Sequence, residues 1–257
     1  MTAIGVVIPT TFNRPGYLVD SIESVRAAGD AFILLCGPNN HRKRLYESLV
    51  DDFSPELHQA KLGAIINHAL KQLPENCEYI TWLGDDDLLT PGSLERSMKI
   101  LEENGDVVLV YGSCDYIDQD GKKIGQNPSG PWAEGLMRFG PFLVPQPGSL
   151  WRRDAFEAIG GISKGFSLAF DHDLFLRLRT RGRFQHIKTT QAAFRWHTGS
   201  LSVGKRWISV MEASKARRKH YLLALAPIWL IWEPLVMLAT KFAGDFVNFR
   251  TKSPPIK

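Results

Sequence analysis

Short apolar runs recur along the chain, and each of them predicts a buried strand. The predicted strands cover residues 4–9, 31–36, 79–83, 107–111 and 148–153, with later candidates at 184–187 and 192–196. Helical patterns are found at residues 17–28, 41–53, 62–73, 91–104 and 154–159, and another helix opens at residue 170. Residues 115–123 predict a hairpin with an Asp-Gly turn. Strands that alternate with helices predict an α/β fold, in which helices cover both faces of a mainly parallel sheet.

The pattern changes after residue 203, which predicts a domain over residues 1–203 and a helical appendage over residues 204–257. A basic stretch at 205–219 is followed by the apolar residues 222–243. Two prolines, a glutamate and a lysine interrupt the apolar run and argue against a single membrane span. We expect an interfacial helix pair that contacts an anionic membrane through residues 205–245. The alternative is a helical hairpin packed on the domain or on a second copy of the chain.

Composition adds three constraints. The net charge of +4 is too small to predict a nucleic-acid partner. Cys36, Cys77 and Cys114 match no metal-binding spacing and predict buried, reduced thiols in a reducing compartment. The sequence enters a strand pattern at once, without the basic and apolar pattern of a signal peptide, so we expect a cytoplasmic protein.

Three adjacent carboxylates, Asp85, Asp86 and Asp87, follow the predicted strand at 79–83. Like charges repel one another, and a hard cation such as Mg²⁺ or Mn²⁺ would relieve that repulsion. The alternative is a solvated acidic turn. The loops at 10–14 and 37–40 also follow strands, and ligands of parallel sheets bind at the carboxyl ends of the strands. The carboxylates are therefore interpreted as part of a binding site.

Two later features are also candidates. Asp171 and Asp173 lie in the first turn of the helix that opens at residue 170, where the helix dipole favours carboxylates. For one of the two, a simple capping role is the expected one. His197 directly follows the last strand candidate, and a single histidine in that position is more often structural than a ligand.

Five segments in order resemble the family 2 glycosyltransferases of the GT-A fold. They are VVIPTTFNRPGYLVDSIES, ITWLGDDDLLTPGSL, PGSLWRRDAFEAIGGI, FDHDLFLRLRTRG and RWHTGSLS. The resemblance covers roughly residues 4–203 and implies a Rossmann-like GT-A domain.

The resemblance also implies a role for individual residues. Asp86 matches the ligand of a divalent metal, Mn²⁺ or Mg²⁺, and Asp85 matches a carboxylate near the donor ribose. Asp87 is expected to assist, Asp171 matches the catalytic base, and His197 matches a residue near the metal and diphosphate. The loop that cradles the nucleotide is matched by Pro9, Thr10, Asn13 and Arg14.

The sequence departs from the family pattern at three places. Gly84 stands where many members have the first Asp of an Asp-x-Asp motif, so we expect a thinner metal shell. Residues 37–40, Gly-Pro-Asn-Asn, replace an Asp-Asp-Gly-Ser stretch, which leaves the nucleotide base open. Phe170 replaces a common Glu before the base, and an apolar setting should raise the pKa of Asp171. Arg14, Lys61 and Arg195 are three candidates for an added positive charge.

The implied reaction is a single displacement that inverts the anomeric carbon of a nucleotide-diphosphate sugar. The metal would neutralise the leaving group, and Asp171 would take the proton of the acceptor hydroxyl. The expected acceptor is a glycan or a lipid-linked intermediate at the inner face of the plasma membrane. Two alternatives are a nucleotidyltransferase-like enzyme, which would not need Asp171, and a non-catalytic protein that binds nucleotides or sugars.

Overall fold

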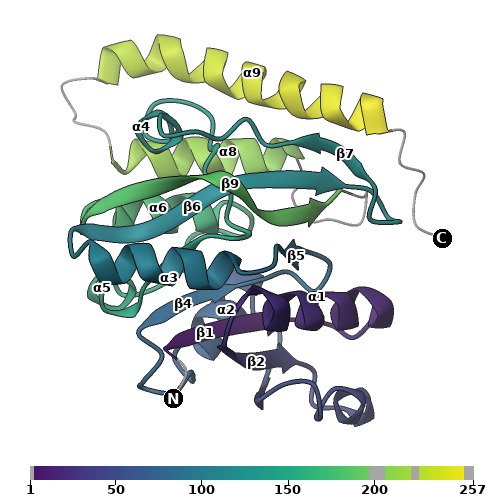
Figure 1. Ribbon diagram of the computed structural model, residues 1–257. Coiled ribbons are helices and arrows are strands. Elements are labelled where there is room, and N and C mark those ends of the chain that lie inside the picture. Colours follow the sequence, from purple (N-terminus) through teal and green to yellow (C-terminus); the bar gives the residue numbers. More distant parts are fainter. Residues whose placement is uncertain (1–2, 197–205, 221–225, 252–257) are drawn as a thin grey trace.

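The computed structural model describes residues 3–196, 206–220 and 226–251 (Figure 1). The strands are β1 (Ile4–Pro9), β2 (Ala31–Gly37), β3 (Asp52–Pro55), β4 (Tyr79–Trp82), β5 (Leu88–Leu89), β6 (Val107–Ile117), β7 (Lys123–Gln126), β8 (Leu150–Arg152) and β9 (Arg183–Arg195). The helices are α1 (Pro15–Ala28), the 3₁₀ helix η1 (His41–Leu45), α2 (Leu62–Leu70), α3 (Ser93–Glu103), α4 (Ala133–Leu136), α5 (Arg153–Ala158), α6 (Phe170–Leu178), α8 (Arg206–Arg218) and α9 (Ala226–Thr251).

The strands form one sheet in the order β3-β2-β1-β4-β8-β6-β9-β5, and β7 pairs with β6. The first four strands in this order are parallel to one another. Strand β8 then joins β4 to β6 and is antiparallel to both, while β6 and β9 are parallel. The α/β fold class is confirmed, and the antiparallel pairs lie in the half of the sheet beyond β4.

Helices cover both faces of the sheet, as the sequence predicts. Successive side chains of a strand point to opposite faces. On one face Val6 and Ile33 pack with α1 and α3, and on the other face Val7 and Leu34 pack with α2 and α6. The two hydrophobic clusters fix the strands in position, so the loops at the carboxyl ends of β1, β2 and β4 start from rigid anchors.

Some element boundaries differ from the prediction. Residues 41–53 were expected to be helical, but they form the short η1 and the start of β3, which pairs with β2. This segment buries little apolar surface, so it lacks the apolar face that would stabilise an amphipathic helix. Pairing with β2 determines the structure of its last residues instead. Strands β6 and β9 are longer than their apolar runs because each supplies backbone partners to the other. The hairpin at 115–123 is confirmed by the pairing of β6 with β7, and its Gly121 has a φ of 81°.

The C-terminal helices α8 and α9 pack against each other and against the domain (Figure 1). Helix α9 runs without a break through Pro234, and Pro227 lies in its first turn, where a missing N–H costs nothing. The ion pair between Arg217 of α8 and Glu233 of α9 is buried on both sides. Among the helices of the described residues, none combines the length and the apolar character needed to cross a bilayer.

The three cysteines, Cys36, Cys77 and Cys114, are free and buried, as predicted.

Candidate active site

A cleft of about 530 Å³ opens at the carboxyl ends of β1, β2 and β4. Its lining includes Pro9, Thr10, Arg14, Asp85, Asp86 and Asp171, which are six of the predicted site residues. The loop before α2 and the segment before α6 complete the walls. The fold thus brings residues that are far apart in the sequence into one cavity, at the edge of the sheet that the strand pattern indicated.

The carboxylates of Asp85 and Asp86 are held by the loop that follows β1. The Thr10 hydroxyl donates a hydrogen bond of 2.7 Å to Asp85 Oδ2. The Arg14 guanidinium lies 3.5 Å from Asp85 Oδ1 and forms a second ion pair with Asp86. Of the candidate cations, Arg14 is therefore the one that contacts both carboxylates at the cleft, and its charge offsets their repulsion.

Asp87 faces the protein interior rather than the cleft. Its residue is 5% exposed, and its Oδ1 accepts a 3.0 Å hydrogen bond from the backbone N–H of Arg195. Burial and the neighbouring Asp86 carboxylate raise the pKa of Asp87 well above its ordinary value. Asp87 thus links the turn of residues 85–87, called here the carboxylate turn, to the end of β9. Its expected role in binding a metal stays a prediction.

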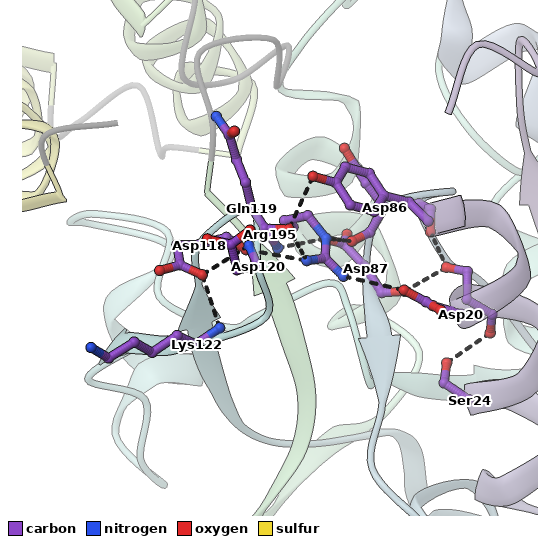
Figure 2. A network of polar contacts seen from close by, with 12 residues as sticks. Asp20, Ser24, Asp86, Asp87, Asp118, Gln119, Asp120, Lys122 and Arg195 are labelled. Atoms are coloured by element: carbon purple, nitrogen blue, oxygen red, sulfur yellow. Dashed lines mark hydrogen bonds and ion pairs between the residues drawn. The ribbon is translucent and has the colours of Figure 1, made fainter. Parts of the chain in front are cut away.

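Arg195 secures the same turn from the other side (Figure 2). Its Nε donates to the Asp86 carbonyl oxygen at 3.0 Å, and its Nη1 donates to the Gln119 carbonyl oxygen at 3.0 Å. The guanidinium also lies 4.1 Å from the centre of the Tyr17 ring. Arg195 is 3% exposed, so its side chain holds the turn in position and does not present a charge to the cleft.

Gly84 and Gly37, which lie at two of the departures from the family pattern, are both closely packed. A Cβ at Gly84 would lie 2.9 Å from Asp87 Oδ2 and 3.0 Å from Asp86 Oδ1. A Cβ at Gly37 would lie 2.7 Å from the Thr10 carbonyl oxygen. Side chains at these positions would crowd the carboxylate turn and the loop that holds it.

Asp171 lies in the first turn of α6 and lines the cleft. Its Oδ1 accepts a 2.8 Å hydrogen bond from the backbone N–H of His172. The residue before it, Phe170, is buried against Trp82, with ring centres 5.9 Å apart. Burial raises the pKa of Asp171 to about 6, which confirms the expected direction. Such a carboxylate is ionised at neutral pH and is basic enough to accept a proton.

Asp173 has a different environment from Asp171. It is buried and pairs with Arg177 of the same helix, with 2.8 Å between Oδ2 and Nε. It therefore supports the packing of α6. Neither aspartate caps the helix, because the N-cap residue is Ala169 and has no capping side chain.

Besides Asp87, two predicted residues do not line the cleft of the described structure. Asn13 is exposed, and its Oδ1 accepts a 3.3 Å hydrogen bond from Arg42. His197 lies outside the described residues. The sequence did not single out Gln146, which lines the cleft and donates a 2.8 Å hydrogen bond to the Trp82 carbonyl oxygen. Its only sequence signal is its place in the long loop at 125–147.

The donor set at the cleft suits a hard divalent cation. Asp85 and Asp86 offer carboxylate oxygens, and the pair already holds a cationic group in Arg14. Across the described residues, no three His, Cys, Asp or Glu side chains are grouped as a complete metal site. Two carboxylates nevertheless fit the usual protein share of an Mg²⁺ site, in which substrate phosphates and water complete the shell.

No protein-family profile matches the chain. Its sequence is similar to those of an O-antigen biosynthesis protein and of an uncharacterized glycosyltransferase. It is 27% identical over 144 residues to the O-antigen biosynthesis protein RfbC of Myxococcus xanthus, which covers 54% of this chain and 11% of that protein. It is 19% identical over 274 residues to an uncharacterized glycosyltransferase of Haemophilus influenzae, which covers 99% of this chain and 92% of that protein. The first curated relatives are much longer, since the chain spans 23% of one from Sinorhizobium fredii.

Solved structures share the fold, and two of them are described below. The Staphylococcus aureus TarS fragment 1–349 in complex with UDP aligns over 84% of this chain and 65% of that one, with a TM-score of 0.60 and 12% identity. The mannosyltransferase PcManGT of Pyrobaculum calidifontis, in complex with GDP-Man and Mn²⁺, aligns over 96% of this chain and 73% of that one, with a TM-score of 0.64 and 13% identity. The predicted resemblance to GT-A-like glycosyltransferases is confirmed at the level of the fold.

Proposed function

We propose that this chain, which has the GT-A-like fold of these glycosyltransferases, moves a sugar from a nucleotide-diphosphate donor to an acceptor hydroxyl. One observation carries the proposal. The paired carboxylates Asp85 and Asp86, with their partners Thr10 and Arg14, share a single cleft with Asp171, a carboxylate whose pKa is about 6. A charged donor site and a basic acceptor site in one cavity are what a direct displacement needs.

The chain's own residues divide the chemistry between them. The loop with Pro9, Thr10 and Arg14 binds the nucleotide, and the Arg14 guanidinium binds the diphosphate. Asp86, with Asp85 beside it, would hold an Mn²⁺ or Mg²⁺ ion, which when bound supplies positive charge to the leaving diphosphate. Asp171 holds the acceptor hydroxyl by a hydrogen bond and takes its proton as the new bond forms. One such displacement inverts the anomeric carbon.

The first prediction tests the donor site by thermal unfolding with GDP-mannose and a panel of UDP-sugars, with and without Mn²⁺. A ligand that binds only the folded chain at about 100 times its Kd stabilises it by about 2.7 kcal/mol. We expect one nucleotide sugar to raise Tm, and to raise it more with Mn²⁺. Asp86→Ala should remove the Mn²⁺-dependent part, whereas Asp120→Ala, at an exposed position of the β6–β7 turn, should keep it.

The alternatives give different results in this assay and in a separate assay of sugar release. A nucleotidyltransferase would respond to a nucleoside triphosphate, which the proposed sugar transfer does not use. Equal responses of wild type and Asp86→Ala, with Mn²⁺ present, would refute the metal role. A chain that binds a nucleotide sugar but releases no sugar from it would be the non-catalytic protein.

We also propose that the solvent-exposed face of α9, called here the outer face, binds the anionic inner surface of the plasma membrane. A lipid-linked acceptor would be found there. Six exposed apolar residues of α9 lie on this face: Ile228, Ile231, Trp232, Leu235, Leu238 and Phe242. Leu230 is also exposed but lies on another side of the helix. At 100° per residue the six residues cover an arc of about 120°, which is the width of an interfacial apolar face. The opposite face packs on the protein through Glu233 and Val236, both buried, so Val236 does not belong to the outer face.

Basic side chains lie on the neighbouring helix and just after it. Arg218 of α8 lies over the Trp229 ring of α9, 3.9 Å from its centre, whereas Lys215 and Lys219 lie over the Phe166 ring of the domain. Each lysine or arginine near an anionic surface adds about 1 kcal/mol of attraction. Apolar area and positive charge on the same pair of helices favour a membrane over a neutral protein partner.

The second prediction is that the intact chain floats with vesicles of phosphatidylcholine and phosphatidylglycerol. The double variant Ile231→Asp with Leu235→Asp should stay in the heavy fraction, because two charges would enter the apolar layer. Leu45→Asp, at a 71% exposed site on η1, is the matched control and should float like wild type. If wild type ignores the vesicles and sediments as a dimer that the double variant does not form, the face is an interface between two copies.

A further inference from the structure

Glu212 of α8 binds the segment that leads into α6. One of its carboxylate oxygens accepts hydrogen bonds from the backbone N–H groups of Ser167, Leu168 and Ala169, at 2.9, 2.7 and 3.1 Å. The first N–H groups of a helix have no partner within the helix and are usually bound by a side chain at the N-cap. The N-cap, Ala169, has no such side chain, and Glu212 from a later helix binds its N–H together with those of the two residues before it.

The segment held by Glu212 is part of the cleft. Ser167 and Leu168 line the cavity, as do Phe170 and Asp171 at the start of α6. Three consecutive N–H groups bound to one carboxylate fix the path of the backbone just before Asp171. The position of the proposed base is therefore set from outside its own helix.

Helix α8 is a firm support for this contact. Ala216 belongs to the buried cluster of the domain, and Lys219 lies 3.9 Å from the buried Asp173 of α6. Lys219 also lies 4.4 Å from the centre of the Phe166 ring, next to the held segment. On its other side, α8 is joined to α9 by the buried pair of Arg217 and Glu233.

Glu212 is charged under ordinary conditions. Burial acts to raise its pKa, but the hydrogen bonds from Leu168, Ala169 and Ser167 outweigh burial and lower the pKa below the usual range. A charged acceptor forms stronger hydrogen bonds than a neutral one, so the contact resists opening.

We infer that Glu212 is a positioning residue for the proposed sugar transfer, because it holds residues 167–169 and through them sets Asp171 in the cleft. The inference rests on the proposed function for the consequence in catalysis, while the anchoring itself does not. It also places a residue that the reaction needs within the C-terminal helices, outside residues 1–203.

The experiment compares Glu212→Ala, Glu212→Gln and the control Met211→Ala in the full chain. Met211 is the preceding residue of α8 and is 43% exposed. The first readout is hydrogen–deuterium exchange of a peptide that covers residues 166–175. Glu212→Ala should exchange there about tenfold faster than wild type, because the bound N–H groups lose their acceptor. Met211→Ala should match wild type.

The second readout is steady-state sugar release from the nucleotide sugar found in the thermal assay, together with calorimetry of UDP or GDP in Mn²⁺. Small displacements of a reacting group lower rates by up to about 10²-fold. We expect Glu212→Ala to lower kcat about 10- to 100-fold with nucleotide affinity within about twofold of wild type. Glu212→Gln keeps one acceptor oxygen and should recover part of both readouts.

Unchanged exchange at 166–175 in Glu212→Ala overturns the inference, whatever the activity. A kcat equal to that of Met211→Ala also overturns it, and so does an equal loss of kcat and nucleotide affinity, which would indicate a general loss of structure. Faster exchange together with a wild type that binds no nucleotide sugar would instead refute the proposed function and leave the anchoring in place.

Discussion

Asp171→Asn should make the protein more stable while it removes the proposed base. The carboxylate of Asp171 has a pKa of about 6 in the fold, against an ordinary value of 3.8. Because the pKa is higher in the folded state, ionisation of this buried carboxylate lowers the free energy of unfolding. The loss is absent below pH 3.8 and complete above pH 6. An asparagine is never charged, so it avoids that penalty and keeps an oxygen for the N–H of His172.

The size of the effect follows from the two pKa values. At pH 8 the penalty is about 3 kcal/mol, and at pH 5 it falls to about 1.6 kcal/mol. The gain of Asp171→Asn should therefore be roughly twice as large at pH 8 as at pH 5. The same variant should keep donor binding and lose about 10²–10⁴-fold in transfer, which is the usual contribution of a general base.

Urea unfolding at the two pH values measures the free energy without any substrate. Asp154→Asn is the matched control, since Asp154 is exposed in the first turn of α5 and accepts a 2.6 Å hydrogen bond from the next backbone N–H, as Asp171 does. The control should change little between pH 5 and pH 8. If Asp171→Asn loses stability, or gains stability equally at both pH values, burial does not raise the pKa of Asp171 as argued. If the variant transfers sugar within about threefold of wild type, Asp171 has no catalytic role.

Two further predictions concern packing. Gly84→Asp brings a third charge against Asp86 and should cost about 1–3 kcal/mol in urea unfolding without strengthening nucleotide binding in Mn²⁺; tighter binding in calorimetry would contradict this. Arg217→Met leaves Glu233 buried without its partner and should cost about 3–5 kcal/mol, whereas Arg217→Met with Glu233→Leu should recover most of that loss. If the double variant is as unstable as the single one, the ion pair is not the reason for the loss.

The sequence predicts most of what the local pattern controls. The apolar strands, the hairpin and the direction of the shift at Asp171 all follow from residues that are adjacent in the chain, such as Phe170 beside Asp171. The meeting of Thr10, Arg14, Asp85 and Asp86 is predicted because parallel strands end at one edge of a sheet. The structure adds their contacts, and among the described residues it places Arg14 against both carboxylates.

What the sequence does not predict depends on contacts between distant residues. Nothing near Asp87 shows that its carboxylate will turn inward to the N–H of Arg195. The anchor of the segment before α6 is equally hidden, because Glu212 comes from a later helix. The rotation of α9 also depends on a distant partner, since Glu233 faces Arg217 and thereby decides which apolar residues face outward.

The place of β8 in the sheet has a consequence for the order in which the chain folds. Strands β1 to β4 are neighbours in the sheet and leave the ribosome first. Strand β6 can join them in the sheet only through β8, and both β8 and its other neighbour β9 are synthesised after it. The carboxylate turn is also pinned late, because β5 pairs with β9 and Asp87 binds the backbone of Arg195. Pairings over such distances form slowly. The half of the sheet with β1 to β4 is thus built early, whereas the acidic turn receives its final shape only after residue 195 has been synthesised. A nascent chain therefore has a partial fold before the cleft is complete.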